Sequence, residues 1–526
     1  MKNTPPHLST LATFSVWLLA AAAVQADVKL ASPFTSHMVL QREMKVPVWG
    51  TAEAGEQVTV EFATQKVSAT AGADGKWRVD LAPLATAADA QVFTVTGSKT
   101  AAPVKLDDVL VGEVWLASGQ SNMVFYVSKS VQGGAPYGLL NEEQEIAAAN
   151  YPKIRMFTGR DTKSYEPQAA VAGTWQVCSP ETVPGFSAVG YLFARDLQRE
   201  LNVPVGIVTV ASGASCAEAW ISREAMAADP AIKFMLDSID ESEKYFRAAP
   251  ADRPAVAPVR PTPINKPRAA GPARLGDPAR DQHSATVLFN GMVNAVIPYA
   301  IRGALWYQGE SICWGTPGLN LYGHVQMALI KDWRARWGEG DFPFYLVQLP
   351  GQQNISNNPR IREEQAAVLA LPHTGMAVTI DLGEAKNVHP HNKAPLGERL
   401  TLLALANTYG KPVEFSGPVF SAAKFEGGAA RVTFTHLGGG LVAKGGVLKG
   451  FVIAGADQKF VEAEAKIDGG TLVVSNPAVA APVAVRYAWD NYPEGLGCNL
   501  TNAAGLPAGP FRTDKWEYPI AGLVEH

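Results

Sequence analysis

The sequence predicts an α/β fold for the central part of the chain, from about residue 107 to residue 410, flanked on both sides by β-rich segments. Short apolar runs of strand length recur there: Val109–Ala117, Val205–Ala211, Gly303–Tyr307, Phe344–Leu349 and Met376–Ile380. Stretches of helical periodicity separate them: Tyr191–Glu200, Leu321–Trp337, Arg362–Leu371 and Leu396–Thr408. Buried strands that alternate with helices are typical of a parallel sheet covered on both faces.

The two flanking segments have a different pattern. In residues 27–106 apolar and polar residues alternate, as at Val58, Val60 and Phe62, and Asp74–Gly75 has the sequence of a hairpin turn. This predicts a small N-terminal β-sandwich module. Strand patterns return in residues 411–526, for example at Val432 and Phe434, and predict a second β-rich module. Within the central domain, residues 250–278 are so rich in proline that we expect an extended excursion there.

Residues 1–26 have the pattern of a secretory signal peptide. Lys2 is followed by the apolar stretch Leu11–Val24 and by the small-residue cleavage site Val24–Ala26. The short, alanine-rich segment favours a bacterial protein that is periplasmic or secreted. No later segment is apolar enough to cross a membrane. The formal net charge of −4 argues against nucleic acid as a partner.

The four cysteines are too few for a disulfide scaffold in a chain of 526 residues: Cys178, Cys216, Cys313 and Cys498. In an oxidising compartment they can form up to two bridges, and their spacing does not choose among the pairings. No close group of cysteine and histidine suggests a zinc site, and no metal or cofactor is predicted.

Ser121 is the first candidate for chemistry. The apolar run from Val111 stops at Gly119–Met123, so a buried strand ends in a turn that presents this serine at the edge of a sheet. Ligands of such sheets bind at the carboxyl ends of the strands. A serine in this position also has an ordinary alternative, the N-cap of the next helix.

Other strand ends supply possible partners for a nucleophile. Gly213 follows the second predicted strand and offers a backbone N–H without a side chain in the way. Gln308 ends the third strand, where its side-chain amide is either a further oxyanion donor or a buried structural group. His389 lies in the loop after the fifth strand, where an imidazole can reach Ser121 and act as its base. His391 is the alternative base if His389 is not required.

Several segments resemble those of the sialate O-acetylesterase family of SGNH hydrolases. They are GEVWLASGQSNM, SGASCAEAW, WYQGES, HPHNKAPLGERL and the closing NYPEGLGCNLTNAAGLPAGPFRTDKW. The resemblance covers nearly the whole mature chain. It implies a flavodoxin-like, three-layer SGNH hydrolase domain with flanking β modules, an enzyme of the carboxylic ester hydrolase class that removes acetyl groups from carbohydrates. By position, Ser121 matches the nucleophile, Ser121, Gly213 and Gln308 match the oxyanion hole, and His389 matches the base.

One departure from the family pattern concerns the residue that orients the base. Relatives place an aspartate two or three residues before the histidine, where this chain has Lys386 and Asn387. Three interpretations follow: a Ser–His dyad oriented by Asn387 or a backbone carbonyl, replacement of the aspartate by Glu384 or Asp381, or weakened catalysis. The first is favoured here. The last also motivates a hypothesis of another class, a non-catalytic carbohydrate-binding protein.

Acetyl groups are small, so specificity must come from the sugar. Four tryptophans lie near the candidate site in sequence: Trp115, Trp220, Trp306 and Trp314. Core packing is the favoured interpretation for Trp115 and Trp306, whereas Trp314, beyond a strand end, is the better candidate for sugar contact. We expect a plant cell-wall hemicellulose such as acetylated xyloglucan as substrate. The alternative, a 9-O-acetylated sialate, needs a cation for its carboxylate, and Arg362 is the candidate. No oligomeric state is predicted.

Overall fold

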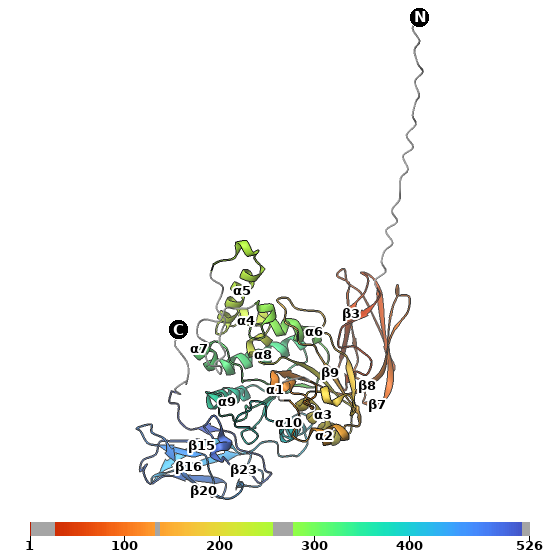
Figure 1. The fold of residues 1–526 in the computed structure, drawn as a ribbon. Coiled ribbons are helices and arrows are strands. Elements are labelled where there is room, and N and C mark those ends of the chain that lie inside the picture. Colours follow the sequence, from red (N-terminus) through yellow and green to blue (C-terminus); the bar gives the residue numbers. More distant parts are fainter. Residues whose placement is uncertain (2–26, 132–136, 256–276, 518–526) are drawn as a thin grey trace.

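The computed structural model describes residue 1 and residues 27–131, 137–255 and 277–517. It is a mixed α/β protein with several sheets (Figure 1). The predicted signal peptide, apart from Met1, and most of the proline-rich excursion lie outside the described residues. At the two ends of that excursion Pro250–Asp252 and Pro278–Arg280 form single 3-10 turns.

Six strands of the largest sheet run parallel in the order β9-β11-β8-β12-β13-β14, with β10 antiparallel at the β9 edge. Their bounds are Val104–Gly119 (β8), Tyr151–Thr158 (β9), Trp175–Cys178 (β10), Val205–Ala211 (β11), Gly303–Tyr307 (β12), Phe344–Val347 (β13) and Thr374–Ala377 (β14). Four of the five predicted strands are present with nearly the predicted bounds, and the fifth, predicted at Met376–Ile380, lies earlier at Thr374–Ala377. Strand β9 was not predicted, because Lys153 and Arg155 interrupt its apolar pattern; Arg155 is buried and pairs with Asp108.

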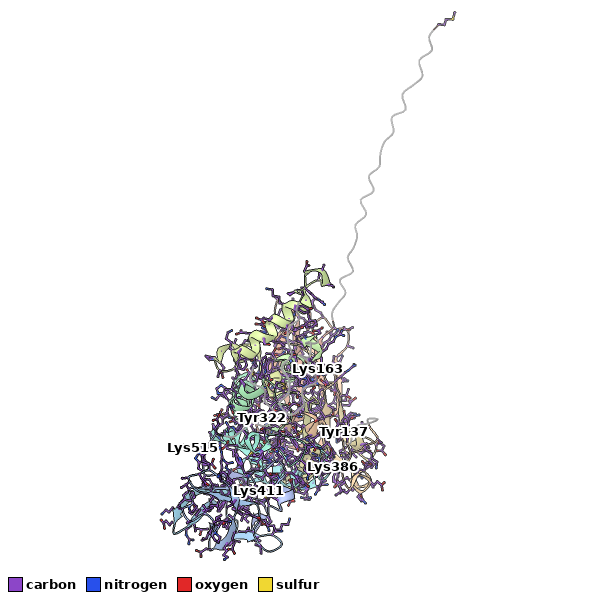
Figure 2. All side chains as sticks on the ribbon, turned by 60° about the vertical axis from the view of Figure 1, so that its left-hand side comes forward. Tyr137, Lys163, Tyr322, Lys386, Lys411 and Lys515 are labelled. Atoms are coloured by element: carbon purple, nitrogen blue, oxygen red, sulfur yellow. A yellow bond between two sulfur atoms is a disulfide. The ribbon has the colours of Figure 1, made fainter. Side chains whose placement is uncertain are left out.

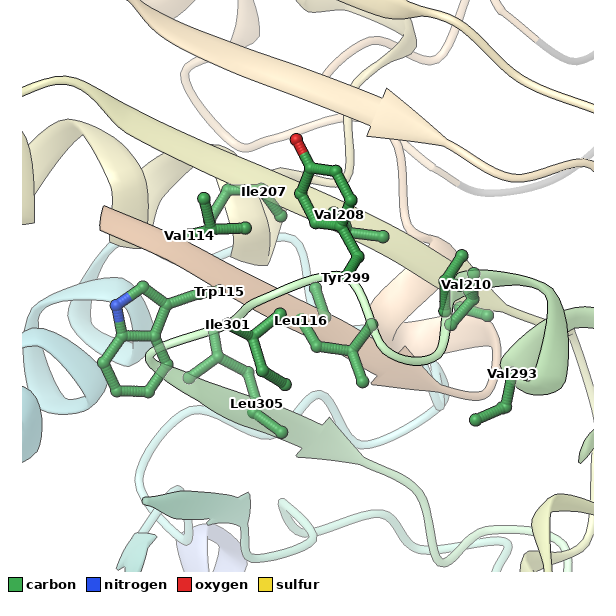
Figure 3. Close-up of a cluster of buried hydrophobic side chains, with 14 of the residues drawn as sticks. Val114, Trp115, Leu116, Ile207, Val208, Val210, Val293, Tyr299, Ile301 and Leu305 are labelled. Carbon is green, nitrogen blue, oxygen red and sulfur yellow. The ribbon is translucent and has the colours of Figure 1, made fainter. Parts of the chain in front are cut away.

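The helices cover this sheet and connect its strands. Their bounds are Ser121–Val124 (α1), Glu142–Ala148 (α2), Ala188–Leu201 (α3), Arg223–Ala228 (α4), Lys233–Arg247 (α5), Asn294–Val296 (α6), Gly315–Asn320 (α7), Tyr322–Trp337 (α8), Asn358–Ala367 (α9) and Ala394–Asn407 (α10). No described helix combines the length and the apolar character that a membrane span requires. Side chains from β8, β11 and β12 form a continuous apolar layer, which includes Trp115, Ile207 and Leu305 (Figure 3).

The N-terminal strands fall into two groups: β2, β4, β5 and β7 belong to the same sheet as β8, whereas β1, β3 and β6 form a separate three-stranded sheet. Their bounds are Lys29–Leu30 (β1), Val39–Gln41 (β2), Val46–Thr51 (β3), Gln57–Phe62 (β4), Gln65–Thr70 (β5), Lys76–Leu81 (β6) and Ala87–Gly97 (β7). Strand β8 pairs with β7 and β2 in its first part and with β11 and β12 in its second. The predicted module boundary after residue 106 therefore falls inside a strand, and one apolar core extends across it.

The C-terminal strands surround a separate apolar core. Their bounds are Val419–Glu426 (β15), Ala429–Thr435 (β16), Leu441–Ala443 (β17), Phe451–Ala454 (β18), Val461–Glu462 (β19), Glu464–Asp468 (β20), Thr471–Ser475 (β21), Ala484–Tyr487 (β22), Leu500–Asn502 (β23) and Phe511–Arg512 (β24). This region touches the central domain through specific polar contacts. Arg512 pairs with Glu363 of α9, and Glu494 accepts hydrogen bonds from the backbone N–H groups of Gly351 and Gly383.

Candidate active site

The turn that carries Ser121 is formed where β8 ends. Gly119 has φ +137°, and a Cβ atom at this position would lie 2.1 Å from the carbonyl oxygen of Tyr307, so only glycine fits. Gln120 then turns inward, and its Oε1 accepts hydrogen bonds from the backbone N–H groups of Gly309 and Ser311, each at 3.2 Å. Ser121 is the first residue of α1. The sheet edge and the adjacent β12 loop thus fix the serine backbone.

His389 reaches this serine from the loop between β14 and α10. Its Nε2 lies 2.7 Å from the Oγ of Ser121, a hydrogen bond between residues 268 positions apart in the chain. A nucleophile and its base require this geometry. Burial, followed by the nearby charges of Lys393 and His391, lowers the pKa of His389 to about 4. The imidazole is therefore neutral near pH 7 and able to accept the serine proton.

Two backbone N–H groups are free to hold an oxyanion. A Cβ atom at Gly213 would lie 3.9 Å from the Cβ of Ser121, so this glycine borders the nucleophile. Neither the N–H of Ser121 nor that of Gly213 donates to a protein acceptor within the described part of the chain. Both N–H groups therefore lie next to the nucleophile and are available to an oxyanion.

Gln308 is in a different position. It is fully buried, and its amide nitrogen donates to the carbonyl oxygens of Ser215 and Ser311 at 3.0 and 2.9 Å. Its Oε1 accepts from the hydroxyl of Tyr322 at 2.6 Å. These bonds contradict the prediction that Gln308 donates to the oxyanion, because both amide hydrogens are already given to carbonyls. Gln308 instead links the loop after β11 to the loop after β12 through these hydrogen bonds.

Asn387 does not contact the imidazole ring of His389 either. Its Oδ1 accepts from the backbone N–H of His389 at 3.0 Å, and its Nδ2 donates to the carbonyl of His389 at 2.8 Å and to Oε2 of Glu384 at 3.1 Å. No described residue hydrogen-bonds Nδ1 of the ring. The prediction that Asn387 orients the ring is therefore wrong; it orients the main chain that carries the ring.

Neither carboxylate that was considered as a replacement reaches the imidazole of His389. Glu384 binds His391, accepting from its backbone N–H at 2.7 Å and lying 2.9 Å from its Nδ1. Burial raises the pKa of Glu384, but the hydrogen bonds from His391 and Asn387 outweigh it and the pKa lies below its ordinary value. Asp381 forms a bidentate ion pair with Arg399, with both bonds at 2.7 Å. The pair of Ser121 and His389 is thus a dyad whose base is held through its loop.

A polar network next to the dyad joins α1, the loop after β12 and the loop before α10. The side-chain amide of Asn122 donates to Glu310, beyond β12, and to the carbonyl of Val388 at 2.9 Å, while its Oδ1 accepts from the ammonium of Lys393. Burial raises the pKa of Glu310 and lowers that of Lys393 to about 7. Because Val388 precedes the base, this network fixes the nucleophile relative to the base.

The loops after β11 and β12 are also joined covalently. Cys216 and Cys313 form a disulfide, whereas Cys178 and Cys498 are free. Trp314, next to this bridge, is half-buried, and its indole N–H donates to Glu218 at 3.1 Å. Burial raises the pKa of Glu218 to about 7. Trp115, Trp220 and Trp306 are buried, which confirms the core interpretation for Trp115 and Trp306.

Among the described residues one group has donor atoms spaced for a metal ion, but two of its three residues form the Cys216–Cys313 disulfide. Cys216, Glu218 and Cys313 each bring one ligand atom to within 4.8 Å of the others. In the disulfide form the two sulfurs are bonded to each other and are not thiolates, which are the form that binds metals. The dyad itself needs no metal for acyl transfer.

Three residues of this network were not predicted from the sequence: Asn122, Glu310 and Lys393. The sequence offered a hint for two of them. Glu310 lies in the segment WYQGES with Gln308, and Lys393 lies in the segment HPHNKAPLGERL with His389. Charged residues so close to buried strand ends are unusual unless they are paired. Which charges pair, however, depends on loops that are distant in the chain.

Comparisons with known proteins show which proteins this chain resembles. A family model described as "Carbohydrate esterase, sialic acid-specific acetylesterase" matches residues 273–405. A sialate O-acetylesterase from Rattus norvegicus is 30% identical over 74% of this chain and 76% of the relative. One from Mus musculus is 29% identical over 95% of this chain and 97% of its own. The solved structure of a carbohydrate acetylesterase from Xanthomonas citri is 34% identical, with a TM-score of 0.78, and covers 93% of this chain and 100% of that one.

Proposed function

Since this chain belongs to the sialate O-acetylesterase family, it is a carboxylic ester hydrolase for O-acetylated sugars, and we propose that Ser121 and His389 carry out the hydrolysis. The observation that carries this assignment is the 2.7 Å hydrogen bond between Ser121 Oγ and His389 Nε2. It lies at the carboxyl edge of the parallel strands, beside a glycine with a free backbone N–H. The alternative of a non-catalytic carbohydrate-binding protein was motivated only by Asn387, which replaces the aspartate of relatives. The hydrogen bond between Ser121 and His389 is present despite this replacement.

In the proposed reaction His389 takes the proton of Ser121 while the serine oxygen bonds to the acetyl carbon. The backbone N–H groups of Ser121 and Gly213 hold the resulting oxyanion. As the intermediate collapses, the C–O bond to the sugar breaks and His389 gives its proton to the departing sugar oxygen. Water, deprotonated by His389, then attacks the acetyl-serine, and acetate leaves as the proton returns to Ser121.

We infer a neutral hemicellulose, such as acetylated xyloglucan, as the substrate. The support is the state of Arg362, the cation considered for a sialate carboxylate. It is 1% exposed, and its guanidinium donates to the carbonyls of Leu349, Pro350, Asp490 and Asn491. A guanidinium committed to four carbonyls inside the protein is not available to an acidic sugar. The second candidate, a 9-O-acetylated sialate, rests on the names of the mammalian relatives.

Acetate release from a panel of substrates tests this proposal. The panel is acetylated xyloglucan, acetylated xylan, a 9-O-acetylated sialate and p-nitrophenyl acetate, each with the wild type and with Ser121→Ala. We expect release from the hemicelluloses and from p-nitrophenyl acetate in the wild type only. Release from the sialate alone would assign the second candidate. Full activity of Ser121→Ala would refute the proposed nucleophile.

We also propose that residues 1–26 direct export and that the parallel sheet is the centre of a three-layer, flavodoxin-like SGNH domain. The Cys216–Cys313 disulfide supports export, because such bonds persist in oxidising compartments. Cleavage after residue 26, measured as the N-terminus of the exported protein, tests this assignment. Recovery of the uncleaved protein in the cytoplasm would contradict it.

A further inference from the structure

Two tyrosines lie beside the dyad and take no part in the reaction described above. The ring of Tyr137 is 5.7 Å from the imidazole of His389, and the ring of Tyr126 is 5.7 Å from that of Tyr137, both in edge-to-face geometry. Figure 2 marks the position of Tyr137. The backbone N–H of Gly138 donates to the carbonyl of Tyr126, and Phe125 packs edge-on against Tyr137 at 5.4 Å. The two rings are therefore fixed next to the base.

Asp161 continues from these rings to the oxyanion side of the site. Its Oδ2 accepts from the hydroxyl of Ser212 at 2.9 Å, and Ser212 precedes Gly213. Burial, followed by the negative charge of Asp161, raises the pKa of Tyr126, so Asp161 lies on the same side of the site as this phenol. Tyr137, Tyr126 and Asp161 thus form an arc from the base to the oxyanion glycine.

The residues of this arc have polar groups that a ligand can reach. Both tyrosines are half-buried, and neither hydroxyl has a hydrogen-bond partner within the part of the chain that the structure describes. The Asp161 side chain is 42% exposed and also pairs with Lys163. Aromatic rings, phenol hydroxyls and a carboxylate are complementary to a sugar, which presents C–H groups on its faces and hydroxyls on its edge.

We propose that Tyr126, Tyr137 and Asp161 form the subsite that binds the neutral pyranose carrying the acetyl group. This inference rests on the proposed function and names the residues that select its sugar. The tyrosine rings pack against the pyranose, and Asp161 accepts a hydrogen bond from a sugar hydroxyl. Because Asp161 is paired with Lys163, it offers a hydrogen-bond acceptor without a net charge, which suits a neutral sugar.

Inhibition of p-nitrophenyl acetate hydrolysis by an unacetylated xyloglucan oligosaccharide tests the subsite. The ester lacks a sugar, so the variants Tyr126→Ala, Tyr137→Ala and Asp161→Asn should lower its kcat/KM much less than they weaken inhibition by the oligosaccharide. Each variant should raise the inhibition constant of the oligosaccharide by about tenfold, because the loss of one sugar contact costs about 1.4 kcal/mol of binding free energy. Tyr151→Ala and Asp468→Asn serve as matched controls, since Tyr151 contacts Tyr191 and Asp468 pairs with Arg431.

The outcomes separate this inference from the proposed function. No inhibition of the wild type, or equal inhibition of all variants, would overturn the subsite. A fall in p-nitrophenyl acetate hydrolysis as large as the loss of inhibition would also overturn it, because the residues would then support the dyad rather than the sugar. The proposed function fails by a different result, the absence of acetate release from acetylated hemicellulose in the wild type.

Discussion

The turn that carries Ser121 and the loop that carries His389 are held in place by different means. Ser121 follows directly on β8, whose backbone is paired on both sides, and Gly119 permits a close approach to Tyr307. His389 lies in an irregular loop whose shape depends on side chains, with Glu384 and Asn387 bonded to its backbone. The nucleophile is therefore positioned by the sheet, and the base by a few side-chain hydrogen bonds.

This difference indicates where the site is robust and where it is vulnerable. A sheet edge tolerates the loss of a single side chain, because its backbone hydrogen bonds remain. A loop held by side chains loses its geometry when one partner is removed. Substitutions that remove a hydrogen bond to the His389 loop, including the bond from Asn122 to Val388, should therefore affect the rate more than substitutions of similar size that touch the Ser121 turn alone.

The largest effects should come from the dyad itself. We expect Ser121→Ala and His389→Ala each to lower kcat for acetate release by about 10³-fold or more, because either change removes nucleophilic catalysis. His391→Ala is the control for loss of a nearby imidazole and should cost about tenfold at most. If His389→Ala retained full activity while His391→Ala did not, the base would be His391.

Removal of Asn122 should lower both activity and stability. In Asn122→Ala the buried Glu310 and Lys393 lose their shared partner, and the carbonyl of Val388 loses its donor. Breaking such a buried charged network costs about 3 kcal/mol or more. Thermal unfolding and kcat measured on the same preparation check this prediction. Wild-type stability would show that the network does not contribute to the fold.

Neutralising Glu384 should weaken the hydrogen bonds that hold the His389 loop without destabilising the rest of the protein. Glu384→Gln keeps the size of the side chain but weakens the bonds from His391 and Asn387, and we expect kcat to fall by about tenfold with little change in unfolding temperature. Glu398→Gln is a control of the same type on the neighbouring helix α10. Equal rates in both variants would mean that the loop holds its shape without this carboxylate.

Loss of the disulfide should affect stability more than catalysis. Cys216 and Cys313 are 97 residues apart, so removing their bond releases a long loop in the unfolded chain, worth about 2–4 kcal/mol. The double variant Cys216→Ala/Cys313→Ala should unfold at lower denaturant concentration and keep most of its kcat. An unchanged denaturation midpoint would contradict this expectation.

The same contrast explains what could be predicted from the sequence. Ser121, Gly213 and His389 follow apolar strands, and the parallel arrangement of those strands brings their ends to one edge, where the structure has them. Strand β9 was missed because the buried Arg155 breaks its pattern. Gln308 and Asn387 were given the wrong partners, because the choice of partner is decided by loops distant in sequence and leaves no local pattern.

The central claim is that His389 acts as a neutral base without an aspartate behind its ring. The direct test is kcat/KM for p-nitrophenyl acetate from about pH 3 to about pH 8, in the wild type and in Asn387→Asp. A base with a lowered pKa is lost only in acid, so wild-type activity should be half-maximal near pH 4 and should reach its plateau below the pKa of about 7 of Lys393. Asn387→Asp should be about tenfold slower, because aspartate cannot donate to Glu384 and adds a second negative charge beside it. A wild-type profile centred near the ordinary imidazole value of 6.5, together with a faster Asn387→Asp enzyme, would contradict this account.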